Sequence, residues 1–258
     1  MRRNPLVSVV MSVFNGEDCV SVAIESILGQ DFVDFEFIIV NDGSLDNTKA
    51  IIESYSDKRI LLINQLNNGL TKSLNVAIEH SSGKYIARQD ADDVSYPSRL
   101  RKQIELMERS NDVVLVGSRA IINNNGLVST SPYLGESIVR HKLKRFKVFV
   151  HSSVMFRKKT FYKIGLYNER FITSQDYDAW IRLLKFGRLL IINDALLERN
   201  LSKESISTKR HTLQCINGYK IRKNIIPIYL NFYYTLLHYF SAKVPLSVVR
   251  LIRVLKKG

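Results

Sequence analysis

The sequence predicts an α/β fold with a mainly parallel central sheet, flanked by helices and followed by a helical appendage at the C-terminus. Over the first 90 residues, short apolar runs rich in β-branched residues alternate with amphipathic segments, as in chains of βαβ units. The apolar runs are continuous, which indicates strands that are covered on both faces. Polar clusters follow three of these runs, at the edge of such a sheet where ligands bind.

The first half of the chain contains four expected strands and three expected helices. After the turn Phe14-Asn-Gly-Glu17, apolar residues recur at i, i+3, i+4, i+7 and i+8 from Val20 to Leu28, which is the spacing of an amphipathic helix. A similar apolar face begins at Leu70, after an Asn-Asn-Gly turn. We expect strands at residues 6–13, 35–40, 59–63 and 85–87, and helices at residues 20–28, 45–55 and 70–78.

Beyond Pro97 the alternation is less regular. A helix is expected to run to about Ser110, with Leu100, Ile104 and Met107 on its inner face. The run 123–126 is typical of a hairpin turn because it combines asparagines with a glycine. We expect strands at residues 113–117, 151–156 and 189–192, a basic helical stretch at 135–149, and a helix that opens near residue 176.

Composition limits the class of protein. A chain of 258 residues with 45% apolar and 24% charged residues is long enough to bury a substantial core. Cys19 and Cys215 are far apart and stand in no cysteine or histidine cluster, which argues against a disulfide framework or a zinc site. The net charge of +14 fits nucleic acid, anionic lipid or a phosphorylated substrate as a partner. No nucleic-acid module is present, and no signal-peptide stretch follows Met1, so we expect a cytoplasmic protein.

The run Asp90-Ala91-Asp92-Asp93 follows the fourth expected strand. In extended backbone, the side chains of Asp90 and Asp92 lean to the same side. Carboxylate oxygens are the ligands that Mg²⁺ and Mn²⁺ prefer, and such ions usually bridge protein to phosphate. A solvated acidic turn is the alternative. Two further polar clusters end neighbouring strands and are expected to face the same crevice, namely Asn15/Glu17 and Asn41/Asp42/Ser44.

Six motifs in order resemble those of the family 2 glycosyltransferases, which have the Rossmann-like GT-A fold. The resemblance covers roughly residues 5 to 200. The motifs are Val9-Val-Met-Ser-Val-Phe-Asn-Gly-Glu17, Ile39-Val-Asn-Asp-Gly-Ser44, Asn68-Gly-Leu with Leu74-Asn75, Ala87-Arg-Gln-Asp-Ala-Asp-Asp93, His151-Ser-Ser-Val-Met-Phe-Arg157 and Ser174-Gln-Asp-Tyr-Asp-Ala-Trp180.

The resemblance implies a UDP-sugar donor, a bound Mn²⁺ or Mg²⁺, and inversion at the anomeric carbon. The residues that it places at the nucleotide sugar are Ser12, Phe14, Asn15, Glu17, Asp42, Lys72, Asp90, Ala91 and Asp92, and those that it places at the metal are Asp92, Asp90 and His151.

Alternatives stay open for several of these positions. Phe14 would otherwise be a core residue, and Asp42 an Asx turn or helix cap. For His151 the alternative is a structural histidine. Lys72, Arg88 and Arg99 would assist the phosphates or be ordinary solvated bases. Trp180 is expected in the core, because it falls on the apolar stripe with Leu183 and Leu184.

The resemblance also implies a catalytic base at the head of a late helix. The family's Glu-Asp pair reads Gln175-Asp176 here, so the first carboxylate is lost while the second remains. We predict that Asp176 is the base, because a helix N-terminus stabilises the ionised carboxylate that a base requires. Asp178 is the alternative reactive group.

The C-terminal residues have a composition of their own. Residues 224–242 carry no charged side chain but six aromatic ones, and the end of the chain is basic. We therefore expect a catalytic domain at 1–212 and a tail at 213–258 that lies on the anionic inner face of the cell membrane. Such a placement would suit a glycan or lipid-linked glycan acceptor in surface polysaccharide synthesis. The alternative is packing on the catalytic domain or on a second subunit, which makes a homodimer an open expectation.

Two other functions remain to be compared with glycosyl transfer. A sugar nucleotidyltransferase would require a Gly-rich basic phosphate loop after the first strand, and Phe14-Asn-Gly-Glu17 is not one. A non-catalytic basic module that binds a membrane would account for the charge. It would not account for three acids at the expected pocket.

Overall fold

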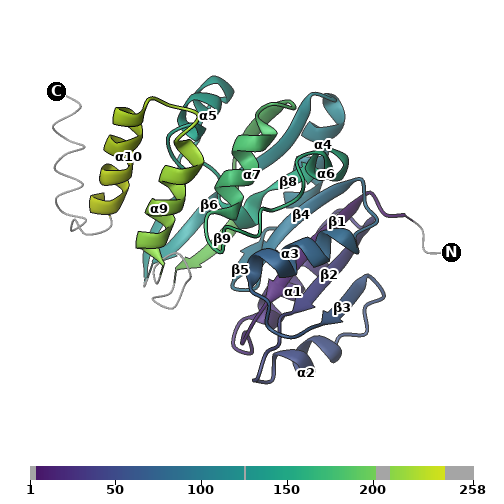
Figure 1. The fold of residues 1–258 in the computed structure, drawn as a ribbon. Helices are drawn as coiled ribbons and strands as arrows, with labels where there is room; N and C mark the ends of the chain where they lie inside the picture. Colours follow the sequence, from purple (N-terminus) through teal and green to yellow (C-terminus); the bar gives the residue numbers. More distant parts are fainter. Residues whose placement is uncertain (1–3, 125, 202–209, 242–258) are drawn as a thin grey trace.

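The computed structural model describes residues 4–124, 126–201 and 210–241, and within these ranges the strands form one nine-stranded sheet (Figure 1). The order across the sheet is β3-β2-β1-β4-β8-β6-β9-β5, and β7 pairs with β6. The strands are β1 (Val7–Val13), β2 (Phe35–Asn41), β3 (Ile60–Asn64), β4 (Tyr85–Asp90), β5 (Asp93–Ser95), β6 (Val113–Asn124), β7 (Leu127–Thr130), β8 (Met155–Arg157) and β9 (Arg188–Leu201).

The helices lie on both faces of this sheet. They are α1 (Val20–Leu28), α2 (Thr48–Glu53), α3 (Leu70–Glu79), α4 (Arg99–Arg109), α5 (Glu136–Leu143), α6 (Lys158–Lys163), α7 (Gln175–Leu183), α9 (His211–Arg222) and α10 (Ile228–Ser241), with a 3₁₀ turn, η1, at His151–Ser153. The predicted α/β class is confirmed, with flanking helices and a helical C-terminal part.

The first four strands match the prediction closely. β1 pairs in parallel with β2 on one side and with β4 on the other, and β2 pairs in parallel with β3. The chain therefore reverses its direction of travel across the sheet between β1 and β4, and this is the switch point where open α/β sheets bind ligands. All segments that follow β1, β2 and β4 emerge at the same edge.

The second half of the sheet is mixed, and here the predicted bounds were partly wrong. β8 is antiparallel to both β4 and β6, whereas β6 and β9 are parallel. Residues 151–153, expected in a strand, form η1 instead, because the buried hydroxyls of Ser152 and Ser153 bind neighbouring groups. β9 has 14 residues rather than the four expected, and β5, β7 and α6 were not predicted.

Two apolar cores fill the space between the sheet and its helices. Val10, Ile38 and Ile86 point to one face and pack with residues of α3, α5, α6 and α7. Val9 and Met11, their neighbours in β1, point to the other face and pack with α1, α2 and α4. Alternate residues of β1 thus pack in two different cores, which explains why its sequence is mainly apolar on both faces.

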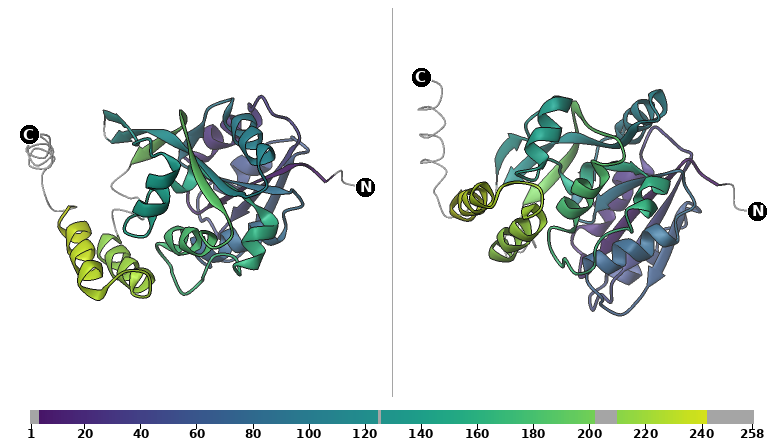
Figure 2. Two further views of the ribbon diagram at one scale, coloured as in Figure 1. Left: turned by 90° about the horizontal axis from the view of Figure 1, so that it is seen from above. Right: turned by 45° about the horizontal axis from the view of Figure 1, so that its top comes forward.

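The C-terminal helices α9 and α10 lie on the far side of the molecule from the N-terminus (Figure 2). The side-chain amide of Asn217 in α9 donates to the backbone oxygen of Thr173, just before α7, over 3.0 Å. The expected boundary between residues 212 and 213 falls in the first turn of α9. Within the described part of the chain, none of the helices has both the length and the apolar character needed to cross a membrane. Residues 242–258 of the expected tail lie outside that part.

Candidate active site

The loops that follow β1 and β2 are tied to each other at the carboxyl edge of the sheet. Asn15 has a positive φ of 51°, and its backbone N–H donates to Ser44 Oγ over 3.0 Å. Its side-chain Oδ1 accepts a hydrogen bond of 2.9 Å from the backbone N–H of Leu45. Glu17 accepts hydrogen bonds of 2.9 Å from the backbone and the side chain of Asn47. The two polar clusters are therefore brought together, and the side chains of Asn15 and Glu17 join the loops.

Ser12 lies near the end of β1, and Phe14 directly follows the strand. Phe14 is 48% exposed, so the alternative that it belongs to the core is wrong. Ser12 is half-buried and lies opposite Asp90 in the parallel ladder between β1 and β4. Both residues therefore lie at the edge from which the acidic residues emerge.

Asp42 is buried and holds the loop that leads into α3. Its carboxylate accepts hydrogen bonds from the side chain of Gln65 (2.7 Å) and from the backbone N–H groups of Asn68 and Gly69 (both 2.9 Å). A carboxylate has roughly four acceptor positions, so three are used and one remains. Lys72, in the first turn of α3, is exposed, as the solvated alternative describes.

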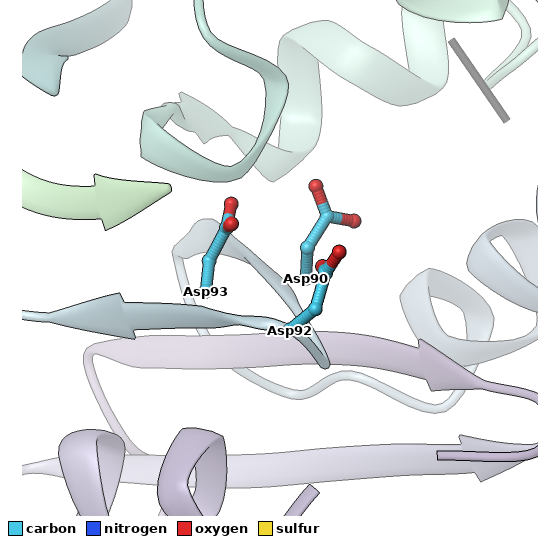
Figure 3. Close-up of side chains that lie close together, drawn as sticks. All are labelled: Asp90, Asp92 and Asp93. Carbon is cyan, nitrogen blue, oxygen red and sulfur yellow. The ribbon is translucent and has the colours of Figure 1, made fainter. Parts of the chain in front are cut away.

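Asp90, Asp92 and Asp93 form a compact group of carboxylates. Asp90 is the last residue of β4, Ala91 and Asp92 make the turn, and Asp93 opens β5. One oxygen from each of the three lies within 4.8 Å of the others, and the side chains point to the same side of the turn (Figure 3). The group differs from the predicted metal set, because Asp93 stands in it and His151 does not.

A buried layer of polar side chains fixes this acidic turn. Gln89 donates to the backbone oxygens of Asp90 (3.0 Å) and Asp93 (2.7 Å). Arg99 donates to Gln89 Oε1 (2.9 Å) and to the backbone oxygen of Arg88 (2.7 Å). Arg88 is fully buried and forms an ion pair with Asp90. Neither arginine is the solvated base of the alternative, since both side chains lie inside the protein.

The charges of the acidic group fit a bound cation. Burial and the neighbouring Asp90 and Asp92 raise the pKa of Asp93 to about 8. Burial, together with Asp90, also raises the pKa of Asp92. Burial opposes the ionisation of Asp90 too, but Arg88 and other nearby cationic groups hold its pKa below the ordinary value. The buried Asp93 Oδ1 has no hydrogen-bond partner. The three carboxylates repel one another when all are ionised, and one of them has an oxygen without a hydrogen-bond partner. Such a group suits a hard divalent cation.

Asp176 lies at the second position of α7 and is almost completely buried. The ammonium group of Lys147 lies 3.3 Å from its Oδ1. Burial opposes ionisation, but Lys147 and His151 hold the pKa of Asp176 below its ordinary value. Asp178 instead accepts a hydrogen bond of 2.8 Å from Arg182. Of the two candidate bases, Asp176 is paired with Lys147, whereas Asp178 is paired with Arg182 of its own helix.

His151 lies close enough to both the acidic group and Asp176 to interact with them electrostatically. Its Nε2 lies 2.9 Å from the hydroxyl of Tyr167, and burial lowers its pKa to about 4, so the imidazole is neutral near pH 7. Both Asp90 and Asp176 act electrostatically on this one ring. The two ends of the candidate site therefore share a neighbourhood. Trp180 is 1% exposed and packs edge-on against His151, which confirms that it belongs to the core.

Lys147 and Arg199 are site residues that the sequence analysis missed. Lys147 lies in a run of basic residues, and nothing in that run distinguishes it. Arg199 lies opposite Asp93 in the antiparallel pair of β5 and β9 and acts electrostatically on all three acids. Its place is created by a pairing of strands about a hundred residues apart, which no local pattern reveals.

Comparison with known proteins gives a family profile and several relatives. The profile described as Glycosyl transferase family 2 matches residues 8–171. An uncharacterized glycosyltransferase of Haemophilus influenzae is 30% identical over 246 residues, which cover 90% of this chain and 76% of the relative. The UDP-Glc:alpha-D-GlcNAc-diphosphoundecaprenol beta-1,3-glucosyltransferase WfgD of Escherichia coli is 30% identical, covering 80% of this chain and 81% of the relative. A Rickettsia felis glycosyltransferase is also 30% identical, but the chain spans only 37% of it.

Two solved structures share the fold. Staphylococcus aureus TarS 1–349 in complex with UDP superposes with a TM-score of 0.65 at 19% identity, covering 93% of this chain and 76% of TarS 1–349. The mannosyltransferase PcManGT of Pyrobaculum calidifontis, in complex with GDP-Man and Mn²⁺, gives a TM-score of 0.68 at 15% identity and covers 98% of this chain and 80% of that one. At these identities the likeness establishes the GT-A fold.

Proposed function

The chain belongs to glycosyltransferase family 2, and from this premise we propose that it transfers a hexose or N-acetylhexosamine from a UDP-sugar to a hydroxyl of a glycan or lipid-linked glycan, with inversion at the anomeric carbon. The observation that carries the proposal is the acidic turn at the switch point of the sheet, with a separate ionised carboxylate, Asp176, in the same neighbourhood.

Three observations support uracil as the nucleobase of the donor. Phe14 presents an exposed ring beyond β1, where a base would stack. Asp42 has one acceptor position left and, being a carboxylate, suits the imide N–H of uracil. The relative WfgD has a UDP-sugar in its name, and TarS has been crystallised with UDP. Ser12, Asn15, Glu17, Lys72 and Ala91 complete the proposed donor site.

Asp90, Asp92 and Asp93 would hold Mn²⁺ or Mg²⁺, which supplies Lewis-acid stabilisation of the negative charge on the departing diphosphate. The complex of PcManGT contains Mn²⁺. His151, predicted as a ligand, is neutral, as a ligand must be, and its Nε2 is paired with Tyr167. We therefore assign His151 a structural role, as a buried ring near both Asp90 and Asp176.

In the proposed reaction, Asp176 accepts the proton of the acceptor hydroxyl as its oxygen bonds to the anomeric carbon. The bond from that carbon to the phosphate oxygen breaks on the opposite face, and its electron pair leaves with UDP. Lys147 keeps Asp176 ionised before the acceptor arrives. Gln175 replaces the family's first acid without adding a second charge beside the base.

We propose further that residues 1–212 are the catalytic part and that the C-terminal region places the enzyme on the inner face of the cell membrane, near a lipid-linked acceptor. The relative WfgD acts, by its name, on an undecaprenol-linked acceptor.

A panel of nucleotide sugars, supplied with Mn²⁺ and a GlcNAc-diphospholipid, tests the activity. We expect release of UDP and a product whose anomeric configuration, read by NMR, is opposite to that of the donor. A retained configuration would contradict inversion. Release of pyrophosphate from UTP and a sugar 1-phosphate, without transfer from any nucleotide sugar, would identify a nucleotidyltransferase instead.

A further inference from the structure

One face of α10 exposes an unbroken stripe of large apolar and aromatic side chains. They recur at i, i+1, i+4, i+5, i+8 and i+9, so they share one side of the helix. This α10 apolar face consists of Ile228, Tyr229, Phe232, Tyr233, Leu236 and Leu237, with exposures from 38% to 73%. Apolar patches of this kind are rarely left exposed to water unless they bind something.

The opposite face of α10 is locked to the protein by buried polar groups. Arg222, at the end of α9, donates from Nε to Asn231 Oδ1 (3.0 Å) and from Nη2 to Thr235 Oγ1 (2.7 Å). The amide of Asn231 in turn donates to the backbone oxygen of Tyr219 (3.0 Å). Turning α10 to hide its apolar face would leave these buried groups without partners, which is costly. The outward orientation of the stripe is therefore fixed by the fold.

The charges around the stripe indicate what it binds. No charged residue occurs from 224 to 242, and the exposed Lys220 and Lys223 precede α10 in the chain. The basic residues Arg250, Arg253, Lys256 and Lys257 follow it in the sequence. An apolar, tyrosine-rich helix face between clusters of cations matches the interface of an anionic bilayer. A second copy of the chain would bring another net charge of +14 against the first.

We propose that the α10 apolar face docks into the surface of an anionic bilayer, with the helix lying in the membrane plane. The described part of α10 has 14 residues and is about 21 Å long, short of the roughly 30 Å needed to span the hydrocarbon core. In Figure 1, α10 lies next to α9 at the outer edge of the described part of the molecule.

The docking surface is joined to the base side of the active site. Arg222 Nη1 donates to the backbone oxygen of Arg145, two residues before Lys147. Asn217 in α9 binds Thr173, three residues before Asp176. Resting on the proposed function, the inference is that docking presents the Asp176 side of the site to the bilayer surface, where the hydroxyl of a lipid-linked acceptor is found.

Flotation of the full chain with phosphatidylcholine vesicles, with and without phosphatidylglycerol, tests the proposal. We expect binding to the anionic vesicles and at least a tenfold weaker affinity for the double variant Phe232→Ser/Leu236→Ser. The matched control is Phe186→Ser, which removes a 43% exposed aromatic ring from outside α10 and should bind like the wild type. Thermal unfolding of each variant shows whether it is folded.

A second probe reports on the helix itself. Phe232→Trp should give tryptophan emission that shifts to the blue on anionic vesicles, and Phe186→Trp should not, while the buried Trp180 provides a constant background. Undiminished flotation of the double variant, with no shift for Phe232→Trp, would overturn the proposal. So would the absence of vesicle binding together with a dimer, in ultracentrifugation, that the double variant abolishes. Sugar transfer to a water-soluble acceptor, followed by the release of UDP, does not depend on docking. This assay therefore tests the proposed transfer separately.

Discussion

Asp93 and Asp176 are two buried carboxylates whose surroundings move their pKa values in opposite directions. Burial and the neighbouring Asp90 and Asp92 raise the pKa of Asp93 to about 8. Asp176 faces Lys147 and His151, and its pKa falls. Carboxylates separated in this way take different roles in catalysis. At the residue scale this contrast supports the proposal that the acidic turn holds the cation and that Asp176 accepts the proton.

Asp176→Asn should keep the donor site intact and remove the base. We expect kcat to fall by about 10²–10⁴-fold, the usual contribution of a general base. The affinity for UDP in the presence of Mn²⁺, measured by calorimetry, should stay unchanged. Asp178→Asn is the matched control because its carboxylate is bound to Arg182. A variant at Asp176 with wild-type turnover would disprove the assignment.

Lys147→Met should change the pH dependence of transfer. Lys147 lowers the pKa of Asp176, so its removal raises that pKa, and the ionised base is then lost at a higher pH as the solution is acidified. The acidic limb of the kcat/KM profile should therefore move to higher pH. Lys144→Met, at an exposed neighbour, should leave the profile in place. An unshifted profile for Lys147→Met would show that the ion pair has no influence on the base.

Asp93→Asn should stabilise the metal-free protein while weakening its response to Mn²⁺. The pKa of Asp93 is raised to about 8 in the folded state. The free energy of unfolding therefore falls as the pH rises from the ordinary range of a carboxyl group to about 8, and the loss is complete above that pH. Above that pH we expect a Tm increase of at least 2–4 °C, the shift that about 1 kcal/mol produces in a domain of this size. Calorimetry with and without Mn²⁺ measures both effects. A lower Tm for the metal-free variant would contradict the proposed repulsion.

At the scale of elements, local patterns were sufficient where neighbouring strands are close in sequence. The largely apolar run 35–40 becomes β2, and the helical spacing from Val20 becomes α1 with the predicted bounds. The patterns failed where pairing is distant. β5 has only three residues and is a strand because it lies against β9, and η1 forms because Ser152 binds Asp93 across the site. The acidic turn was predicted, but its buried support was not.

Gln89→Ala tests that support. Gln89 is fully buried and joins the backbone of Asp90 and Asp93 to Arg99. Its loss leaves buried partners unsatisfied, at about 1–3 kcal/mol for each group that remains unpaired. Denaturant unfolding should show this destabilisation, and calorimetry should show weaker binding of UDP with Mn²⁺. Asn67→Ala, which changes an exposed loop residue, is the control, since Gln65 is half-buried and binds Asp42. Equal effects of the two variants would disprove a specific role for Gln89.

At the scale of the whole molecule, the acidic turn and the exposed apolar surface lie in different parts of the protein. The acidic turn lies at the switch point of the sheet, and the α10 apolar face lies beyond α9, on the side that holds Lys147 and Asp176. The net charge and the uncharged run 224–242 predicted a surface helix from the sequence. Its direction was not predictable, because the lock between Arg222, Asn231 and Thr235 exists only after α9 and α10 have packed together.

The central claim is that a cation on the acidic turn and the base Asp176 serve one substrate site. Anomalous diffraction from crystals grown with Mn²⁺ and UDP tests it most directly. The account predicts a manganese peak bonded to the acidic turn and to the diphosphate of UDP, with Asp176 across the same cavity. A peak at any other place, or a UDP molecule from which Asp176 is walled off, would contradict it.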